Sequence, residues 1–264
     1  MKPFELHNVT CQIGKKPLLE GISLSVEKSD FLGVIGPNGA GKSTLLRLLN
    51  ATMKPSGGKL SLLGKDLVSA SQRDILRLRR KIATVPQIMD FNLSIPLTAR
   101  EVVEIARIGR NGPGRSLSPI DTAKMEESME LMGISSLANR TFRSLSGGEK
   151  QKVQMARVLA QEPDILLLDE PTSSLDMDWQ ERLVRLIEDI HLKNKFTVVM
   201  TTHITGHLPS RCERIVLLKQ GRILFDGRFG EALTKENLEK LYDCRVDILS
   251  HSGRIHCFGI GAKE

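Results

Sequence analysis

The sequence has little that would place the chain in or across a membrane. No apolar run approaches the roughly 20 residues that a membrane-spanning helix needs. Residues 1–6 lack the long apolar region of a signal peptide. We therefore expect a cytoplasmic protein.

Structural metal sites and disulfides are also not indicated. The cysteines are Cys11, Cys212, Cys244 and Cys257. They form no C-x-x-C pair, which argues against a zinc site or a disulfide framework and fits a reducing compartment. His203 and His207 have the i, i+4 spacing of a helical metal pair, but no third ligand is apparent nearby. Two unrelated histidines are the better interpretation.

Aromatic residues are scarce, with one Trp and one Tyr in 264 residues, so stacking on nucleic-acid bases has little to use. The 38 basic and 31 acidic residues give a net charge of +7. This charge fits nucleic acid, an anionic membrane face or a nucleotide site. The densest basic run is Arg77, Arg79, Arg80 and Lys81. It lies in a stretch with the pattern of an exposed helix, and we expect it to be a solvated face.

What the sequence does contain is a phosphate-binding pattern at residues 36–44, called here the phosphate loop. Its residues are Gly36, Pro37, Asn38, Gly39, Ala40, Gly41, Lys42, Ser43 and Thr44, which fit G-x-x-x-x-G-K-[ST]. A strand is predicted over 30–35 and a helix over 45–49, as the motif requires. Glycines let the backbone N–H groups turn toward an anion, and the helix N-terminus adds positive charge. Lys42 is expected to reach the β- and γ-phosphates of ATP, and the Ser43 hydroxyl to bind Mg²⁺.

A second set of residues follows a continuous apolar run at 164–169, which predicts a strand buried on both faces of a parallel sheet. Nucleotide sites of this kind need a carboxylate at a strand end to hold the metal. Asp169 ends the run and suits that role. Glu170 follows it and is expected to act as general base toward a water aimed at the γ-phosphate.

Residues 145–151, called here the signature segment, have the sequence L-S-G-G-E-K-Q. Ser146 and Glu149 have the spacing of a capping box, and Gly147 and Gly148 expose N–H groups at the start of a helix. Taken alone, this stretch predicts no more than a well-capped helix.

With the other motifs, the stretch resembles the signature of ABC-type ATPases, in the family's order. Gln87 resembles the glutamine of the loop that enters the helical subdomain, and residues 174–176 resemble the loop after the catalytic glutamate. His203, after a predicted strand, resembles the switch histidine. The resemblance covers residues 4–230.

The resemblance implies an α/β P-loop NTPase of the ABC-ATPase fold, with a RecA-like, mostly parallel core, an antiparallel β subdomain and a helical subdomain. It implies one domain over 1–264, with the core and β subdomain in 1–91 and 161–230. The helical subdomain would be 92–160, and 231–264 a short C-terminal tail.

The resemblance also implies the site. Glu170, His203 and Gln87 would be catalytic, and Ser43, Gln87 and Asp169 would hold Mg²⁺. Ser146, Gly147, Gly148, Glu149 and Asp176 would join the phosphate loop in binding ATP. The signature segment of one copy would face ATP held by another copy, in a head-to-tail homodimer.

Local sequence patterns predict further details of the helices and of the tail. Thr98 and Glu101 form a capping box for a helix through about Arg107, followed by a loop at 111–114. Asp121 is expected to cap the next helix, with Met125, Met129 and Met132 in the core. Asp176 is expected to cap a later helix. A short helix near 236–242 and a hairpin turned at residues 252–253 are expected in the tail.

One position departs from the family pattern. An aromatic residue usually stands just before the glycine of the first turn and stacks on adenine, whereas this chain has Ile13 before Gly14. An isoleucine packs on a base but has no π-face. We therefore expect weaker adenine binding than in relatives with Tyr.

The leading functional hypothesis is the ATPase subunit of a transporter, peripheral on the inner face of the cell membrane. Its partners would be separate permease subunits and a substrate-binding protein, with no nucleic acid. Residues 98–104 and 160–170 and the short tail resemble importers of iron chelates, cobalamin and metals. The alternative is a soluble ABC-type ATPase acting on nucleic acid or ribosomes. A kinase or GTPase is a third interpretation, and the signature segment argues against it.

Overall fold

The computed structural model describes residues 2–87, 96–112, 114–209, 212–251 and 253–262. Its helices are α1 (Lys42–Leu49), α2 (Gln72–Lys81), α3 (Ala99–Asn111), α4 (Pro119–Leu131), α5 (Gly147–Ala160), α6 (Met177–Asn194), α7 (Phe229–Ala232) and α8 (Lys235–Tyr242), with short 3-10 helices η1 (Ser135–Leu137), η2 (Phe142–Ser144) and η3 (Thr205–His207). Its strands are β1 (Phe4–Ile13), β2 (Lys16–Val26), β3 (Phe31–Ile35), β4 (Gly57–Leu62), β5 (Lys65–Asp66), β6 (Ile82–Val85), β7 (Ile165–Asp169), β8 (Thr197–Thr202), β9 (Arg214–Lys219), β10 (Arg222–Arg228), β11 (Cys244–His251) and β12 (Arg254–Ala262).

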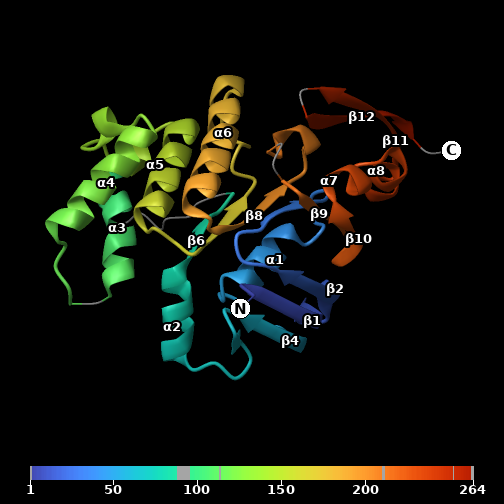
Figure 1. The fold of residues 1–264 in the computed structure, drawn as a ribbon, viewed down its shortest axis with the longest axis horizontal. Helices are drawn as coiled ribbons and strands as arrows, with labels where there is room; N and C mark the ends of the chain where they lie inside the picture. Colours follow the sequence, from blue (N-terminus) through green and yellow to red (C-terminus); the bar gives the residue numbers. More distant parts are fainter. Residues whose placement is uncertain (1, 88–95, 113, 210–211, 252, 263–264) are drawn as a thin grey trace.

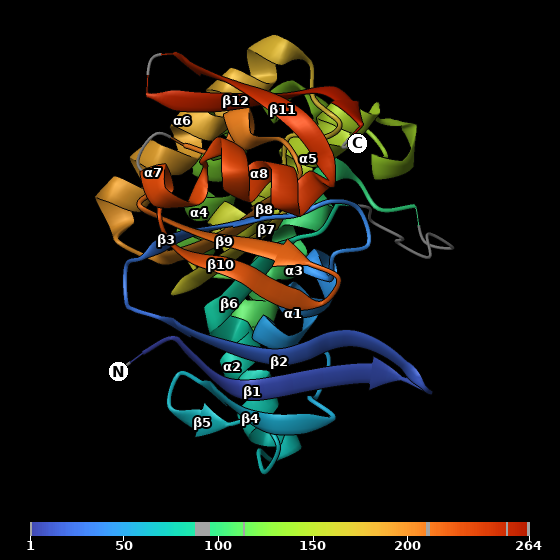
Figure 2. The same ribbon diagram turned by 90° about the vertical axis from the view of Figure 1, so that its right-hand side faces the viewer.

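The central sheet has the strand order β10-β9-β3-β8-β7-β6. All neighbouring pairs are parallel except β9 and β10. An antiparallel sheet of order β2-β1-β4-β5 lies beneath it, and α1 lies between the two sheets (Figures 1 and 2). This arrangement confirms the predicted fold class.

Alternation along the buried strands divides the apolar core into two clusters. In β7, Ile165 and Leu167 pack toward α1 and the antiparallel sheet. Leu166 and Leu168 pack toward α3–α6 and the tail. A strand that is buried on both faces therefore needs its continuous apolar sequence, because successive side chains point to opposite faces.

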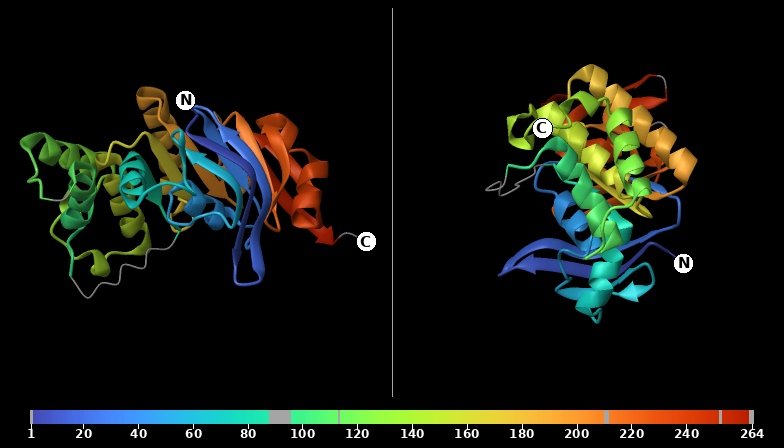
Figure 3. Two further views of the ribbon diagram at one scale, coloured as in Figure 1. Left: turned by 90° about the horizontal axis from the view of Figure 1, so that it is seen from below. Right: turned by 90° about the vertical axis from the view of Figure 1, so that its left-hand side faces the viewer.

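Helices α3, α4 and α5 pack on one another and project from one end of the molecule (Figure 3). Met125, Met129 and Met132 are at most 3% exposed, which confirms that this methionine stripe is core. The predicted boundary between residues 91 and 92 lies outside the described residues, and the proposed division into subdomains stays a prediction. No described helix is long and apolar enough to cross a bilayer.

Several local predictions need correction. Ser118, not Asp121, is the N-cap of α4, and Asp121 is the third helical residue of a capping box. Helix α1 begins at Lys42 rather than at residue 45, because the phosphate loop leads into it directly. Helix α3 continues to Asn111, beyond the predicted end near Arg107, and ends at Gly112, whose φ of 91° stops it.

Other predictions hold. The basic run Arg77, Arg79, Arg80 and Lys81 lies on a helix, α2, and is exposed, as predicted. The tail contains α8 and the hairpin of β11 and β12, as predicted. Residue 252, predicted in the hairpin turn, lies outside the described residues.

Candidate functional site

The order of the central strands brings the predicted site residues to one edge. Strand β8 lies between β3 and β7, and the three strands are parallel. The carboxyl ends of parallel strands meet at the same edge of a sheet, where α/β proteins bind ligands. The phosphate loop follows β3, Asp169 and Glu170 stand at the end of β7, and His203 follows β8.

Two glycines shape the phosphate loop. At Gly36, an added Cβ would lie 2.3 Å from the carbonyl oxygen of Leu218, so only glycine lets the loop leave β3 this close to β9. Gly41 has a φ of 106°, in the left-handed region that glycine adopts without strain. The Lys42 ammonium folds back and donates to the carbonyl oxygens of Gly36 and Pro37 at 2.7 and 3.2 Å.

The N-terminus of α1 differs from those of the other long helices. Helices α2, α3, α4, α5, α6 and α8 are capped by the side chains of Ser71, Thr98, Ser118, Ser146, Asp176 and Thr234. Helix α1 starts after Gly41, with no capping side chain and no acidic residue in its first turn. Its first N–H groups and its positive dipole end are therefore available to an external anion.

Glu170 lies at the centre of the site. One carboxylate oxygen is 3.1 Å from the Lys42 ammonium. The other accepts from the Gln87 side-chain amide at 2.9 Å and lies 3.0 Å from Nδ1 of His203. Glu170 is 4% exposed and has a φ of 48°, unusual for a residue other than glycine. The three predicted catalytic residues and the loop lysine thus meet at one carboxylate.

The predicted metal ligands also come together. Ser43, Gln87 and Asp169 line one cavity beside the phosphate loop. The Thr201 hydroxyl donates to Asp169 at 2.6 Å and orients its carboxylate. Hydroxyl, amide and carboxylate oxygens are the hard ligands that suit Mg²⁺. No cluster of three or more His, Cys, Asp or Glu side chains suited to a metal occurs in the part of the chain described, so the His203–His207 pair has no third ligand there.

A wider cavity of about 590 Å³ lies over the phosphate loop. Residues 38–44, Gln87 and Glu170 line it, together with Lys16, Pro17 and Leu18 from β2. The sequence did not point to these β2 residues, because only the pairing of β1 with β2 brings them to the loop. Ile13 pairs with Lys16 across that turn and is 60% exposed.

The signature segment starts α5 as predicted. Ser146 accepts from the Glu149 N–H, and the Glu149 carboxylate accepts from the Ser146 N–H at 2.7 Å. Ser146 and Gly147 are exposed, and they are not among the described residues that line the phosphate-loop cavity. The structure therefore does not bring the signature segment to the phosphate loop of its own chain.

Residues 174–176 lie against the signature segment. An added Cβ at Gly147 would be 4.0 Å from Cβ of Ser174, and one at Gly148 would be 3.6 Å from the Ser174 carbonyl oxygen. Gln151, buried in α5, donates to the carbonyl oxygen of Pro171 at 2.9 Å. Asp176 caps α6 by accepting from the Trp179 N–H at 2.9 Å, as predicted.

His207 has a different environment from His203. Its Nδ1 lies 2.8 Å from the Thr172 hydroxyl, so it joins the loop after β8 to the segment after Glu170. Burial, with a smaller effect from His203, lowers the pKa of His207 below its ordinary value.

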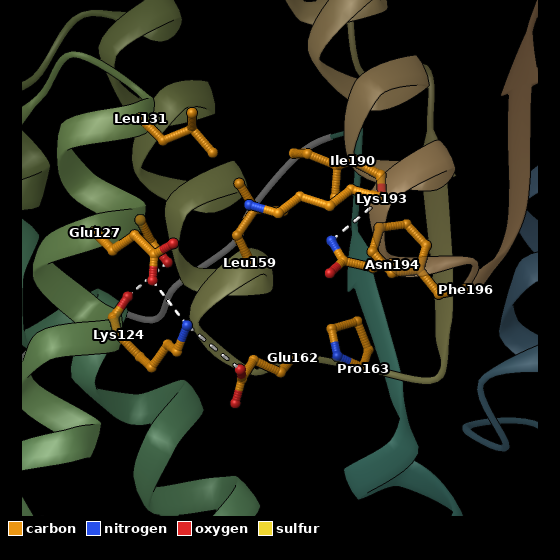
Figure 4. A pocket seen from close by; sticks show the side chains of 11 residues that line it. Lys124, Glu127, Leu131, Leu159, Glu162, Pro163, Ile190, Lys193, Asn194 and Phe196 are labelled. Carbon is orange, nitrogen blue, oxygen red and sulfur yellow. Dashed lines mark hydrogen bonds and ion pairs between the residues drawn. The ribbon is translucent and has the colours of Figure 1, made fainter.

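A separate cavity of about 260 Å³ lies between α4, α5 and α6 (Figure 4). Lys124, Glu127 and Glu162 form one side, while Lys193 and Phe196 lie on the other. The Lys124 ammonium forms ion pairs with Glu127 and Glu162 on that side, at 2.8 and 3.8 Å. No predicted site residue is among the described residues that line it.

Comparison with known proteins also identifies the chain as similar to ABC transporter ATPases. The family model described as "ABC transporter" matches residues 19–173. The phosphonates import ATP-binding protein PhnC 1 of Ruegeria sp. (strain TM1040) is 36% identical over 90% of this chain and 93% of its own length. The hemin import ATP-binding protein HmuV of Bordetella avium (strain 197N) is 37% identical over 90% and 91%. The cobalamin import ATP-binding protein BtuD of Halobacterium salinarum (strain ATCC 29341 / DSM 671 / R1) is 36% identical over 88% of this chain and 56% of its own length.

Solved structures are similar over most of this chain. The dimeric ATP-binding cassette MJ0796, in a post-hydrolysis state with ADP and Pi, has a TM-score of 0.76 at 31% identity and covers 85% of this chain and 98% of that chain. An inward-facing ABC transporter described as metal-chelate type has a TM-score of 0.80 at 26% identity, with 98% of each chain covered.

Proposed function

The chain belongs to the ABC transporter family of ATPases, and from this membership we propose that it is the ATP-hydrolysing subunit of an importer. The observation that carries the proposal is the position of Glu170 between Lys42, Gln87 and His203. A carboxylate beside the phosphate-binding lysine and at a strand end is where a general base for the attacking water is needed.

The site residues have distinct roles in this proposal. ATP places its phosphates on the N–H groups of the phosphate loop, and its γ-phosphate competes with Glu170 for the Lys42 ammonium. Once released from that ion pair, the Glu170 carboxylate accepts a proton from the attacking water. Gln87 and His203 hold Glu170 in place, and His203 also contacts the γ-phosphate. This preorganised positive environment lowers the energy of the transition state.

Mg²⁺ would be held by Ser43, Gln87 and Asp169, whose oxygen donors fit it, and would neutralise charge on the phosphates. Thr201 supports this set by fixing the Asp169 carboxylate.

Two copies complete two sites in this proposal. Ser146, Gly147, Gly148 and Glu149 of one copy would face the ATP held by the other, and Asp176 would lie at the same interface. Three observations support it: the signature segment is exposed, it lies away from its own phosphate loop, and the related cassette MJ0796 is dimeric.

The transport part rests on the relatives. We propose that the dimer docks on permease subunits at the inner face of the membrane, with a substrate-binding protein in the full system. The hemin and cobalamin importers and the metal-chelate transporter support an iron chelate, metal or similar cargo. Co-purification with a polytopic membrane protein tests this part, and salt-dependent binding to nucleic acid instead would favour the alternative.

Glu170→Gln tests the base directly. It keeps the shape of the side chain and its contact with Gln87 but removes the charge. We expect the ATPase rate to fall by about 10²–10⁴-fold, while ATP still binds. Glu236→Gln, which removes an exposed carboxylate on α8 that pairs with Lys240, is the control with an unchanged rate. A Glu170→Gln protein that hydrolyses ATP at the wild-type rate would show that Glu170 is not the base.

A further inference from the structure

The C-terminal tail contacts the loop that carries His203. Tyr242, the only tyrosine of the chain, is the last residue of α8. Its hydroxyl donates to the backbone carbonyl oxygen of His203 at 2.8 Å, across 39 residues of sequence. The tail therefore reaches the site at the residue whose imidazole lies 3.0 Å from Glu170.

The β11–β12 hairpin makes further contacts with the same loop. The Cys257 N–H donates to the Thr205 hydroxyl at 3.1 Å. The His256 ring lies so close to Gly206 that an added Cβ there would be 2.4 Å from it. Residues 203, 205 and 206 are thus each contacted by the tail, through two different elements.

The tail is firmly attached and can serve as a support. Leu238, Leu241 and Val246 are at most 1% exposed and belong to the same core cluster as β7, β8 and β9. The Lys219 ammonium at the end of β9 binds the carbonyl oxygen of Lys240 near the C-terminus of α8. In Figure 2 the tail covers the same face of the central sheet as α5 and α6.

The imidazole of His203 depends on such support. Its side chain is 40% exposed, and among the described residues it contacts the Glu170 carboxylate. A rotation of the backbone at residue 203 would move the imidazole away from the carboxylate. Burial, with smaller effects from Cys257 and Cys244, raises the pKa of Tyr242, so its hydroxyl stays a hydrogen-bond donor at neutral and alkaline pH.

We propose that Tyr242 is a positioning residue for ATP hydrolysis: by holding the His203 carbonyl, it fixes the imidazole against Glu170. This inference rests on the proposed roles of His203 and Glu170. Tyr242 contacts neither ATP nor the attacking water, so it acts on the rate through His203.

The test is Tyr242→Phe, which removes the hydroxyl and keeps the ring in the core. Loss of one hydrogen bond of ordinary net strength corresponds to a kcat roughly two- to tenfold lower, with KM for ATP nearly unchanged. Deuterium uptake in peptides covering 201–209 should be faster, with other peptides unchanged. Lys240→Ala, which removes an exposed ion pair with Glu236 on the same helix, is the matched control and should match wild type in both measurements.

A double-variant cycle separates the two proposals. If Tyr242 acts through His203, then Tyr242→Phe has no added effect on kcat in a His203→Ala background. A normal kcat in Tyr242→Phe, or an equal loss in both backgrounds, would overturn the positioning role and leave the proposed function intact. A His203→Ala protein with the wild-type rate would overturn the proposed role of His203, and the positioning role with it.

Discussion

Two adjacent acidic residues at the end of β7 make different contacts. Asp169 and Glu170 are adjacent, yet Asp169 accepts from Thr201 beside the cavity with Ser43, whereas Glu170 meets Lys42. Strand β7 ends at Asp169, and the left-handed backbone at Glu170 turns the chain there. Two carboxylates in sequence can therefore take two roles, one toward the metal and one toward the water.

We predict that His207 makes the stability of the protein sensitive to acid. Burial lowers its pKa in the folded chain below the ordinary value of 6.5. As the pH falls through 6.5, the unfolded chain binds this proton first, so the folded state loses stability until the lower folded pKa is passed. We expect the urea midpoint to fall more between pH 7.5 and pH 5 (roughly the range over which histidine titrates) in wild type than in His207→Asn. Equal losses in the two proteins would contradict this assignment.

We expect Ile13 to lie on the adenine side of the site. It is 60% exposed at the end of β1, so a larger ring fits there without overpacking. We expect Ile13→Tyr to lower the Kd for ATP about two- to tenfold, the range for aromatic contacts beyond simple burial. Ile13→Leu is the control, because it keeps the apolar character without a π-face. An unchanged Kd for ATP in Ile13→Tyr would contradict the hypothesis that Ile13 weakens adenine binding.

The motif residues could be predicted individually from the sequence, whereas the residues that hold them in position could not. Lys42, Glu170 and His203 each follow a strand whose apolar sequence is visible, whereas their meeting in one site was implied by the resemblance to ABC-type ATPases. Tyr242 gives no local signal, since its partner is 39 residues away and the contact is to a backbone carbonyl. The pairing of Ile13 with Lys16 likewise depends on the register of β1 and β2.

At the scale of elements, helix ends show how close a prediction can come and still be wrong. Ser118 and Asp121 belong to one capping box, so the start of α4 was recognised with the wrong residue as cap. Asp121 instead does two tasks: it accepts from the Ser118 N–H and pairs with the buried Arg107 guanidinium at 2.6 Å. The local sequence around Asp121 does not indicate that Arg107 on α3 is its partner.

Because Ser118 and Asp121 have different roles, we expect their substitutions to lower the free energy of unfolding by different amounts. Ser118→Ala removes one cap and should lower the free energy of unfolding by about 1 kcal/mol. Asp121→Ala should cost clearly more, because it also leaves Arg107 buried without this partner. Thr98→Ala, at the equivalent position of the α3 capping box, is the matched control and should resemble Ser118→Ala. Urea unfolding measures all three, and equal costs for Ser118→Ala and Asp121→Ala would refute the assignment.

At the scale of the whole molecule, the proposed dimer places the phosphate loop and the signature segment of one chain in two different sites. In a symmetric head-to-tail dimer, the phosphate loop of each copy faces the signature segment of the other copy. Lys42→Ala disables one half of a site, and Ser146→Arg places a bulky charge in the other half. Each variant alone should be inactive, although the Ser146→Arg chain still binds ATP.

Mixing the two variants should restore activity. A mixed dimer keeps one site with both halves intact, so an equal mixture should recover roughly a quarter of the wild-type rate if pairing is random and sites act independently. ATPase activity at increasing proportions of one variant measures this. A mixture that stays inactive would count against sites shared between copies.

The contact between Tyr242 and His203 also has a consequence for synthesis. Ribosomes make the chain from its N-terminus, so the phosphate loop, Glu170 and His203 all leave the ribosome before Tyr242 and the β12 strand that touches Thr205. Under the proposed positioning role, hydrolysis at the full rate therefore requires residues that are synthesised after the whole phosphate-binding part of the site.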